Sequence, residues 1–414
     1  MRVPTGELSI TTLLRCPAMI RVRRLLLLLT VAALVAGTIA TVPASAAKRK
    51  VPHGFFGAVM SSEMGNPSLV SNAALDRQFA LMAQSGVESV RSILSWPDIE
   101  TAEGTYNWAA LDRTVATAGR HGIELLPNVL TTPKWASSRP NATYWWRYEP
   151  RSPKLFADFM AALVKRYGPQ GSFWRANPSF KKKPIRTWQL FNEQMADFFW
   201  ATRPWPQSYT RVLKAAYKAI HKADHGATVI AGSLVAVSGT SQWTSAAQLY
   251  KAGAKRYFDA LAVHPFTNNE GSVAGTIDNM LTIIKKVRAV MKRNHDGRKE
   301  LFLTEFTWPA ALGKVPSSRL LGLETTPKGQ KVRMKAGYKA LAQQARKLHV
   351  THALWFSWAT PYDANSAQGD VGYRFAGLMK FRGGTFSRMP ILRTYTQLAT
   401  KYEGCKKAAS GKCR

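Results

Sequence analysis

Apolar residues gather along this chain in eight short runs, separated by longer segments with the 3.6-residue period of amphipathic helices. The runs cover residues 54–60, 87–94, 123–130, 185–191, 227–234, 258–264, 300–306 and 352–358. The helical segments cover residues 72–85, 109–121, 152–167, 208–223, 241–253, 276–292, 329–348 and 389–402. Strands that alternate with helices form right-handed βαβ units and pair in parallel. The pattern therefore predicts an α/β protein with a (β/α)8 TIM barrel.

An open, doubly wound parallel sheet is the alternative architecture. Such a sheet would carry a G-x-G-x-x-G phosphate loop after its first strand, and "GAVMSSEMGNP" at that place does not match this motif. No Pro-, Ser- or Gly-rich linker interrupts the repeats, so we expect one barrel domain over residues 47–404.

Residues 1–46 have the form of an export signal. Three arginines precede an apolar run over residues 25–39, and Ala-Ser-Ala at 44–46 offers a cleavage site. Met19 is an alternative start. An uncleaved anchor is the rival interpretation, but the run is shorter than the ~20 residues that a bilayer span needs. We therefore expect a secreted protein, extracellular or associated with the cell envelope, without stable membrane insertion.

The chain is strongly basic, with a formal net charge of +34. Its cations are scattered, with small clusters at 48–50, 181–183 and 285–286. The positive electrostatic potential of such a surface attracts polyanions of any kind. No zinc-finger, helix-turn-helix or RNA-binding signature accompanies the charge, so specific nucleic-acid binding is not predicted. An anionic cell-envelope polymer is a candidate partner, and a charge that serves only solubility is the simpler explanation.

The chain contains three cysteines, and in an oxidising compartment two of them could pair. Cys16 lies in the export signal, whereas Cys405 and Cys413 bracket a short loop in the basic tail, residues 405–414. We expect these two to form a disulfide, with two free thiols as the alternative. The sequence has no His/Cys cluster with metal-ligand spacing, and it predicts neither a metal nor an organic cofactor.

Two of the predicted strands end in carboxylates. The fourth ends in Asn192 and Glu193, and the seventh carries Glu305 near its end. Reactive groups of such barrels sit at the carboxyl ends of the strands, so the two glutamates face each other across the mouth. Retaining glycosidases place two carboxyls ~5–5.5 Å apart in this way. A single glutamate at a strand end is more often a solvated charge, but the matched pair favours catalysis.

Several segments in order resemble a known enzyme clan. They are "VRSILSWPDIETAEGTYNWAALDRTVATAGRHGIELLPNVLTTPKWAS", "WQLFNEQ", "VHPF", "LTEFTW" and "WFSW". Over about residues 54–402 the chain resembles the (β/α)8 retaining glycoside hydrolases with glutamates after strands four and seven. Among these it is most similar to families 39 and 5, which include cellulase-like enzymes.

The resemblance implies roles for four residues. Glu193 would be the general acid/base and Glu305 the nucleophile, while Asn192 would bind the sugar 2-hydroxyl. Arg91 would keep Glu305 ionised, because a nucleophilic carboxylate needs a cation beside it. A barrel-lining ion pair without a catalytic role is the alternative for Arg91.

The sixth strand departs from the clan pattern. His264 ends this strand in "AVHPF", and Phe266 follows where clan members often have a tyrosine whose hydroxyl contacts the nucleophile. Either His264 or Tyr362 is a candidate to replace that contact. A structural role is the alternative for His264.

Aromatic residues predict a sugar-binding groove. Trp358 resembles the tryptophan on which the clan stacks its sugar, since an aromatic plate suits the flat C–H face of a sugar ring. Trp135 and Trp200 belong to aromatic-rich loops after strands three and four, where packing between the loops is the alternative. So many aromatics outside the core suggest a polymer substrate.

These observations together predict a monomeric, secreted retaining glycoside hydrolase. Its substrate would be a polysaccharide or oligosaccharide, and endo-action is favoured over exo-action. A non-catalytic glycan-binding barrel that adheres to an anionic envelope polymer is the alternative function.

Overall fold

The computed structural model describes residues 48–268, 271–362 and 371–405. The predicted signal peptide and Cys413 lie outside these residues, so the export signal and the Cys405–Cys413 disulfide stay predictions. Within the described part of the chain, no helix combines the length and apolar character needed to cross a bilayer.

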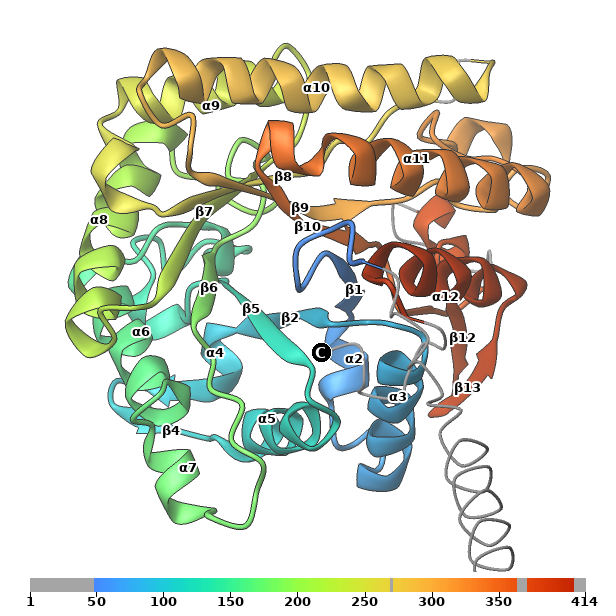
Figure 1. The fold of residues 1–414 in the computed structure, drawn as a ribbon. Coiled ribbons are helices and arrows are strands. Elements are labelled where there is room, and N and C mark those ends of the chain that lie inside the picture. Colours follow the sequence, from blue (N-terminus) through green and yellow to red (C-terminus); the bar gives the residue numbers. More distant parts are fainter. Residues whose placement is uncertain (1–47, 269–270, 363–370, 406–414) are drawn as a thin grey trace, which may run out of the picture. The chain divides into compact units, whose positions relative to one another are not determined.

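Eight parallel strands close into a barrel in the order β1-β10-β9-β8-β7-β6-β5-β2 (Figure 1). They are β1 (Phe56–Met60), β2 (Ser89–Ser95), β5 (Glu124–Leu130), β6 (Thr187–Leu190), β7 (Thr228–Leu234), β8 (Ala260–Val263), β9 (Glu300–Phe306) and β10 (Val350–Trp355). Each of them lies within, or starts or ends close to, one of the eight predicted runs. The TIM barrel expected from the sequence is confirmed.

Eight helices longer than eight residues follow the barrel strands in the described part of the chain. They are α3 (Asn72–Gln84), α5 (Ala109–His121), α6 (Pro153–Tyr167), α8 (Trp205–Ala223), α9 (Gln242–Lys251), α10 (Val273–Arg293), α11 (Pro327–Leu348) and α12 (Pro390–Glu403). All eight helical segments of the sequence are confirmed, with shifts of a few residues at their ends. The start of α11 shows why: Pro327 occupies its first turn and Thr326 caps Gly329 N–H, so the helix begins before the apolar period does.

Smaller elements lie in the connections between the barrel strands and helices. They are the helices α2 (Ser62–Gly65), α4 (Trp96–Ile99) and α7 (Ser172–Ala176), the hairpin β3 (Glu100–Ala102) with β4 (Thr105–Tyr106), and a sheet of β11 (Ala359–Thr360), β12 (Met379–Arg382) and β13 (Thr385–Arg388). None of these was predicted, because each is too short to show a hydrophobic period.

The inside of the barrel changes from apolar to polar along the strands. A small buried cluster fills its interior, formed by Leu126, Ile230, Ala260, Ala262 and Phe302. Successive side chains of a strand alternate between its faces, so residues two apart point the same way. His264 and Thr304 accordingly follow Ala262 and Phe302 on the inner face. Polar groups therefore meet at the carboxyl ends of the strands, above an apolar floor.

Candidate active site

The chain leaves β6 in an unusual conformation that aims Glu193. Phe191 and Glu193 have positive backbone φ angles of 63° and 44°. Residues other than glycine rarely adopt such angles. The Leu190 carbonyl just before them accepts hydrogen bonds from Tyr209 Oη at 2.9 Å and Gln194 Nε2 at 3.1 Å. Tyr209 and Gln194 are fully buried, so packing and hydrogen bonds together hold this turn in place.

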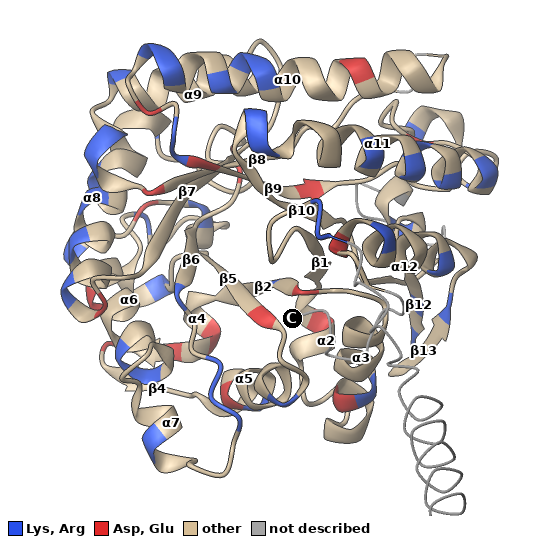
Figure 2. Cartoon of the chain, in the orientation of Figure 1, with Lys and Arg blue, Asp and Glu red and all other residues tan. Residues whose placement is uncertain are grey.

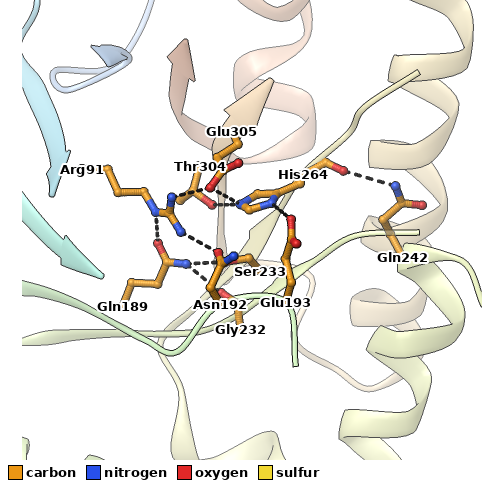
Figure 3. A network of polar contacts seen from close by, with 10 residues as sticks. All are labelled: Arg91, Gln189, Asn192, Glu193, Gly232, Ser233, Gln242, His264, Thr304 and Glu305. Carbon is orange, nitrogen blue, oxygen red and sulfur yellow. Dashed lines mark hydrogen bonds and ion pairs between the residues drawn. The ribbon is translucent and has the colours of Figure 1, made fainter. Parts of the chain in front are cut away.

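Arg91 of β2 connects the ends of β6 and β9 (Figure 3). Its side chain is 1% exposed, and Nη1 donates to Glu305 Oε1 at 2.5 Å. Nη2 donates to Asn192 Oδ1 at 2.7 Å. The guanidinium and the Glu305 carboxylate thus form a buried ion pair. Arg91 therefore lies where the sequence predicted it, against Glu305.

Three further residues orient Arg91 and Asn192 and were missed in the sequence. Gln189 Oε1 accepts from Arg91 Nε at 2.8 Å, and Gln189 Nε2 donates to the Ser233 hydroxyl and to the Gly232 carbonyl. Ser233 Oγ donates to Asn192 Oδ1 at 3.1 Å. A polar residue inside an otherwise apolar strand, such as the Gln in "WQLF", was the signal that could have revealed this network.

His264 bridges the two glutamates. Its Nδ1 lies 2.6 Å from Glu193 Oε1, while Nε2 lies 3.0 Å from Thr304 Oγ1 and 3.7 Å from Glu305 Oε1. Gln242 fixes the backbone by donating to the His264 carbonyl at 3.2 Å. The ring is fully buried, and this desolvation lowers the pKa of His264 to about 4; the nearby Glu305 opposes the shift and Arg91 adds to it. His264 is therefore neutral at pH 7 and lies between the two candidate carboxylates.

The two carboxylates lie close together. One oxygen of Glu193, one nitrogen of His264 and one oxygen of Glu305 all lie within 4.8 Å of one another. Retaining glycosidases, which work by double displacement, place their two carboxyls ~5–5.5 Å apart, whereas inverting enzymes separate theirs by ~6.5–9.5 Å. The spacing of Glu193 and Glu305 therefore suits double displacement. The same three atoms could ligate a cation. Both ring nitrogens of His264 already face polar partners, however, and the charge of Arg91 beside Glu305 opposes a metal ion there.

Two of the predicted sugar-binding tryptophans belong to the core instead. Trp358 is fully buried, and its Nε1 donates to Gln78 of α3 at 3.0 Å. Trp200 is 1% exposed, and its Nε1 donates to Ser208 at 2.9 Å. Neither ring has a free face, so the predicted sugar contacts of Trp358 and Trp200 are wrong. Trp135 is partly exposed, and its role stays a prediction.

Tyr362 does not replace the hydroxyl that Phe266 lacks. Its Oη donates to the Gly377 carbonyl at 2.8 Å, and burial raises the pKa of Tyr362. The groups beside Glu305 are Arg91 and, at longer range, His264. The departure from the clan pattern at Phe266 is thus accompanied by a histidine that contacts both catalytic candidates.

Other aromatic side chains remain accessible in the loops. Tyr144 and Phe198, which are 49% and 58% exposed, lie on the guanidinium of Arg147 at 4.2 and 4.7 Å from their ring centres. Arg147 belongs to the loop after β5, and Phe198 follows Glu193 in the loop after β6. These loops are also tied together by a hydrogen bond from Ala201 N–H to the Arg147 carbonyl.

Comparisons with known proteins find one partial family match. A family model described as beta-galactosidase, glycoside hydrolase family 42, matches residues 65–151, about a fifth of the chain. Among curated proteins none matches.

Solved structures share the fold. A family 39 glycoside hydrolase from the gut symbiont Bacteroides cellulosilyticus WH2 has a TM-score of 0.58 at 17% identity, covering 85% of this chain and 64% of that one. A glucosidase from Croceicoccus marinus has a TM-score of 0.60 at 14% identity, covering 86% and 70%. A family 5 mannosidase from Rhizomucor miehei has a TM-score of 0.56 at 12% identity, covering 84% and 92%. The chain spans less than two thirds of the family 39 enzyme. It is similar to the (β/α)8 glycoside hydrolases, as its motifs predicted.

Proposed function

We propose that this protein is a retaining glycoside hydrolase that acts through Glu193 and Glu305. The observation that carries the proposal is the approach of the two carboxylates to within 4.8 Å at the carboxyl ends of β6 and β9. The similarity to glycoside hydrolases supports a glycosidase, and the spacing supports retention of configuration.

In the first step Glu305 attacks the anomeric carbon while Glu193 gives its proton to the leaving oxygen. The carbon–oxygen bond breaks, the leaving sugar departs as an alcohol, and a glycosyl ester forms on Glu305. Arg91 pairs with Glu305 and orients its carboxylate for the attack. Asn192, whose oxygen accepts from Arg91 and Ser233, is left with its amide N–H groups as donors to the sugar.

In the second step Glu193 takes a proton from a water molecule as the water oxygen attacks the anomeric carbon. The bond from this carbon to Glu305 breaks, so the sugar leaves with its configuration retained and the Glu305 carboxylate is restored. A neutral His264 suits both states of Glu193. Its Nδ1 accepts from a protonated carboxyl and, as the other tautomer, donates to a carboxylate. The Thr304 hydroxyl can donate or accept, so it matches either tautomer.

Exposed aromatic side chains and the surface charge bear on the type of substrate. Exposed Tyr144 and Phe198 beside the acid/base loop support endo-action on a polysaccharide. The outer helices carry the basic charge (Figure 2): α11 has five lysines and two arginines and no Asp or Glu. This supports an anionic envelope polymer as substrate or anchor of a secreted, monomeric enzyme.

A pair of substitutions tests the mechanism. Glu305→Gln should abolish hydrolysis of a polysaccharide panel while the protein still folds, as shown by a cooperative unfolding transition in urea. Glu193→Ala should still form the glycosyl ester from nitrophenyl glycosides, whose leaving group needs no proton, and added azide should then restore turnover and yield a glycosyl azide of retained configuration. Hydrolysis that survives Glu305→Gln would show that another residue is the nucleophile. A matched change outside the barrel, Asp278→Asn, should leave activity unchanged.

A further inference from the structure

We propose that Asn128 of β5 is a positioning residue of the candidate active site, where it holds the turn that carries Glu193. Its side chain is 1% exposed. Asn128 lies two residues after Leu126, which belongs to the apolar cluster inside the barrel, so its side chain also points to the inner face. The inference rests on the proposed function, because it concerns the orientation of the proposed acid/base.

The amide of Asn128 connects the guanidinium of Arg91 to the backbone after β6. Its Oδ1 accepts from Arg91 Nη2 at 2.8 Å, and its Nδ2 donates to the Phe191 carbonyl at 2.8 Å. The reverse orientation would set the amide N–H groups against the guanidinium and the amide oxygen against the carbonyl, so the chemistry of both partners selects this one. Arg91 Nη2 has a second N–H, which donates to Asn192. Both contacts of Asn128 are therefore complementary.

Phe191 is the residue that needs this support. Its φ angle of 63° is rare for a large side chain, and such a conformation persists only where surrounding contacts hold it. The strand β5 holds Phe191 from both sides, because its N–H donates to the Val129 carbonyl at 2.7 Å and its carbonyl accepts from Asn128. Only the bond from Asn128 comes from a side chain, so a substitution can remove it.

The position of Glu193 depends on this turn. Asn192 and Glu193 follow Phe191 directly, so a rotation of the Phe191 backbone moves both side chains. In the present arrangement Glu193 Oε1 lies 2.6 Å from His264 Nδ1. A general acid must lie within hydrogen-bond reach of the oxygen that it protonates. Glu305 comes from β9, a different strand, so losing this bond should impair proton transfer more than nucleophilic attack.

The test compares two leaving groups. Dinitrophenol departs without a proton, whereas phenol needs the proton of Glu193. The probes are dinitrophenyl and phenyl glycosides of glucose, galactose, mannose and xylose and of their disaccharides, and kcat/KM reports the first step alone. Asn128→Leu has a similar size but neither donates nor accepts. It should lower kcat/KM about 100-fold or more for the phenyl glycoside but only about tenfold or less for the dinitrophenyl glycoside.

Two further variants separate positioning from loss of stability. Asn128→Asp keeps an oxygen for Arg91 but, when ionised, has no donor for the Phe191 carbonyl, so it should show the same selective loss. The matched control is Leu125→Ala, which truncates a buried side chain on the outer face of the same strand. It should destabilise the fold in urea and leave the ratio of the two kcat/KM values unchanged.

A crystal structure of Asn128→Leu gives a readout that does not require hydrolysis. The Glu193 carboxyl should lie beyond hydrogen-bond distance of His264 Nδ1. An equal loss for both leaving groups, or a Glu193 carboxyl that stays against His264, would overturn the inference. A wild type that cleaves neither these glycosides nor the polysaccharide panel would refute the proposed function, and the crystal structure would still decide whether Asn128 holds the turn.

Discussion

The buried neutral His264 predicts that the protein loses stability between pH 7 and pH 5. Its ring is fully buried and its pKa is lowered to about 4, whereas histidine in an unfolded chain titrates near ~6.5. In this window the unfolded state binds a proton that the native state does not. Stability therefore falls as the pH falls from about 6.5 towards 4.

The size of this stability loss follows from the difference in proton binding between the unfolded and the native state. Between pH 7 and pH 5 the shift of His264 from ~6.5 to about 4 removes about 2 kcal/mol of unfolding free energy, and the full loss below pH 4 is about 3 kcal/mol. The comparison is between the wild type and His264→Asn, since asparagine keeps a polar group near Glu193 but does not titrate. Other groups titrate in both proteins, so their contributions cancel in the difference.

The assay is urea unfolding followed by tryptophan fluorescence at pH 7 and pH 5 and constant ionic strength. Wild type should lose about 2 kcal/mol more than His264→Asn over this interval. Equal losses in the two proteins would mean that His264 is protonated in the folded protein at pH 5, and the argument for a neutral bridging ring would fall.

Three substitutions separate catalytic from structural roles. Arg91→Met should lower kcat by 100-fold or more and reduce stability by about 3–5 kcal/mol, since it strands the Glu305 charge; an unchanged kcat would contradict the role of the guanidinium. Trp358→Ala should cost about 3–5 kcal/mol in urea unfolding but leave kcat of the folded enzyme nearly unchanged, and a selective loss of kcat would restore its predicted sugar contact. Tyr209→Phe should cost about 1–3 kcal/mol and lower kcat, because the Leu190 carbonyl loses a partner; full activity would show that the turn needs no such support.

The barrel could be predicted because its strands and helices repeat strong local signals. Each strand is a short apolar run, and each long helix shows a 3.6-residue period. The sheet of β11, β12 and β13 was missed because its strands have only two to four residues. The pairing of β11 with β12 joins segments about twenty residues apart and leaves no local pattern, whereas β12 and β13 form a hairpin over Gly383 and Gly384, a local turn signal that was overlooked.

The site was predicted in part for similar reasons. Glu193, Glu305 and His264 lie at or next to the carboxyl ends of strands, where the topology of a barrel brings them together, and Arg91 lies inside β2 and reaches them from the inner face of the barrel. Trp358 was misassigned, because burial of a tryptophan depends on its neighbours. Here α3 supplies Gln78 as a partner for the indole N–H, and the local sequence "WFSW" does not show this.

The long pairing of β2 with β5 limits how this protein can change. Seven consecutive residues, from Ser89 to Ser95, match Glu124 to Leu130 one for one. Inserting or deleting a single residue in β2 would exchange its faces, so a guanidinium would turn towards the helices and a small hydroxyl towards the barrel. We therefore expect natural and engineered variants to accept length changes in the loops around β2 but never inside it.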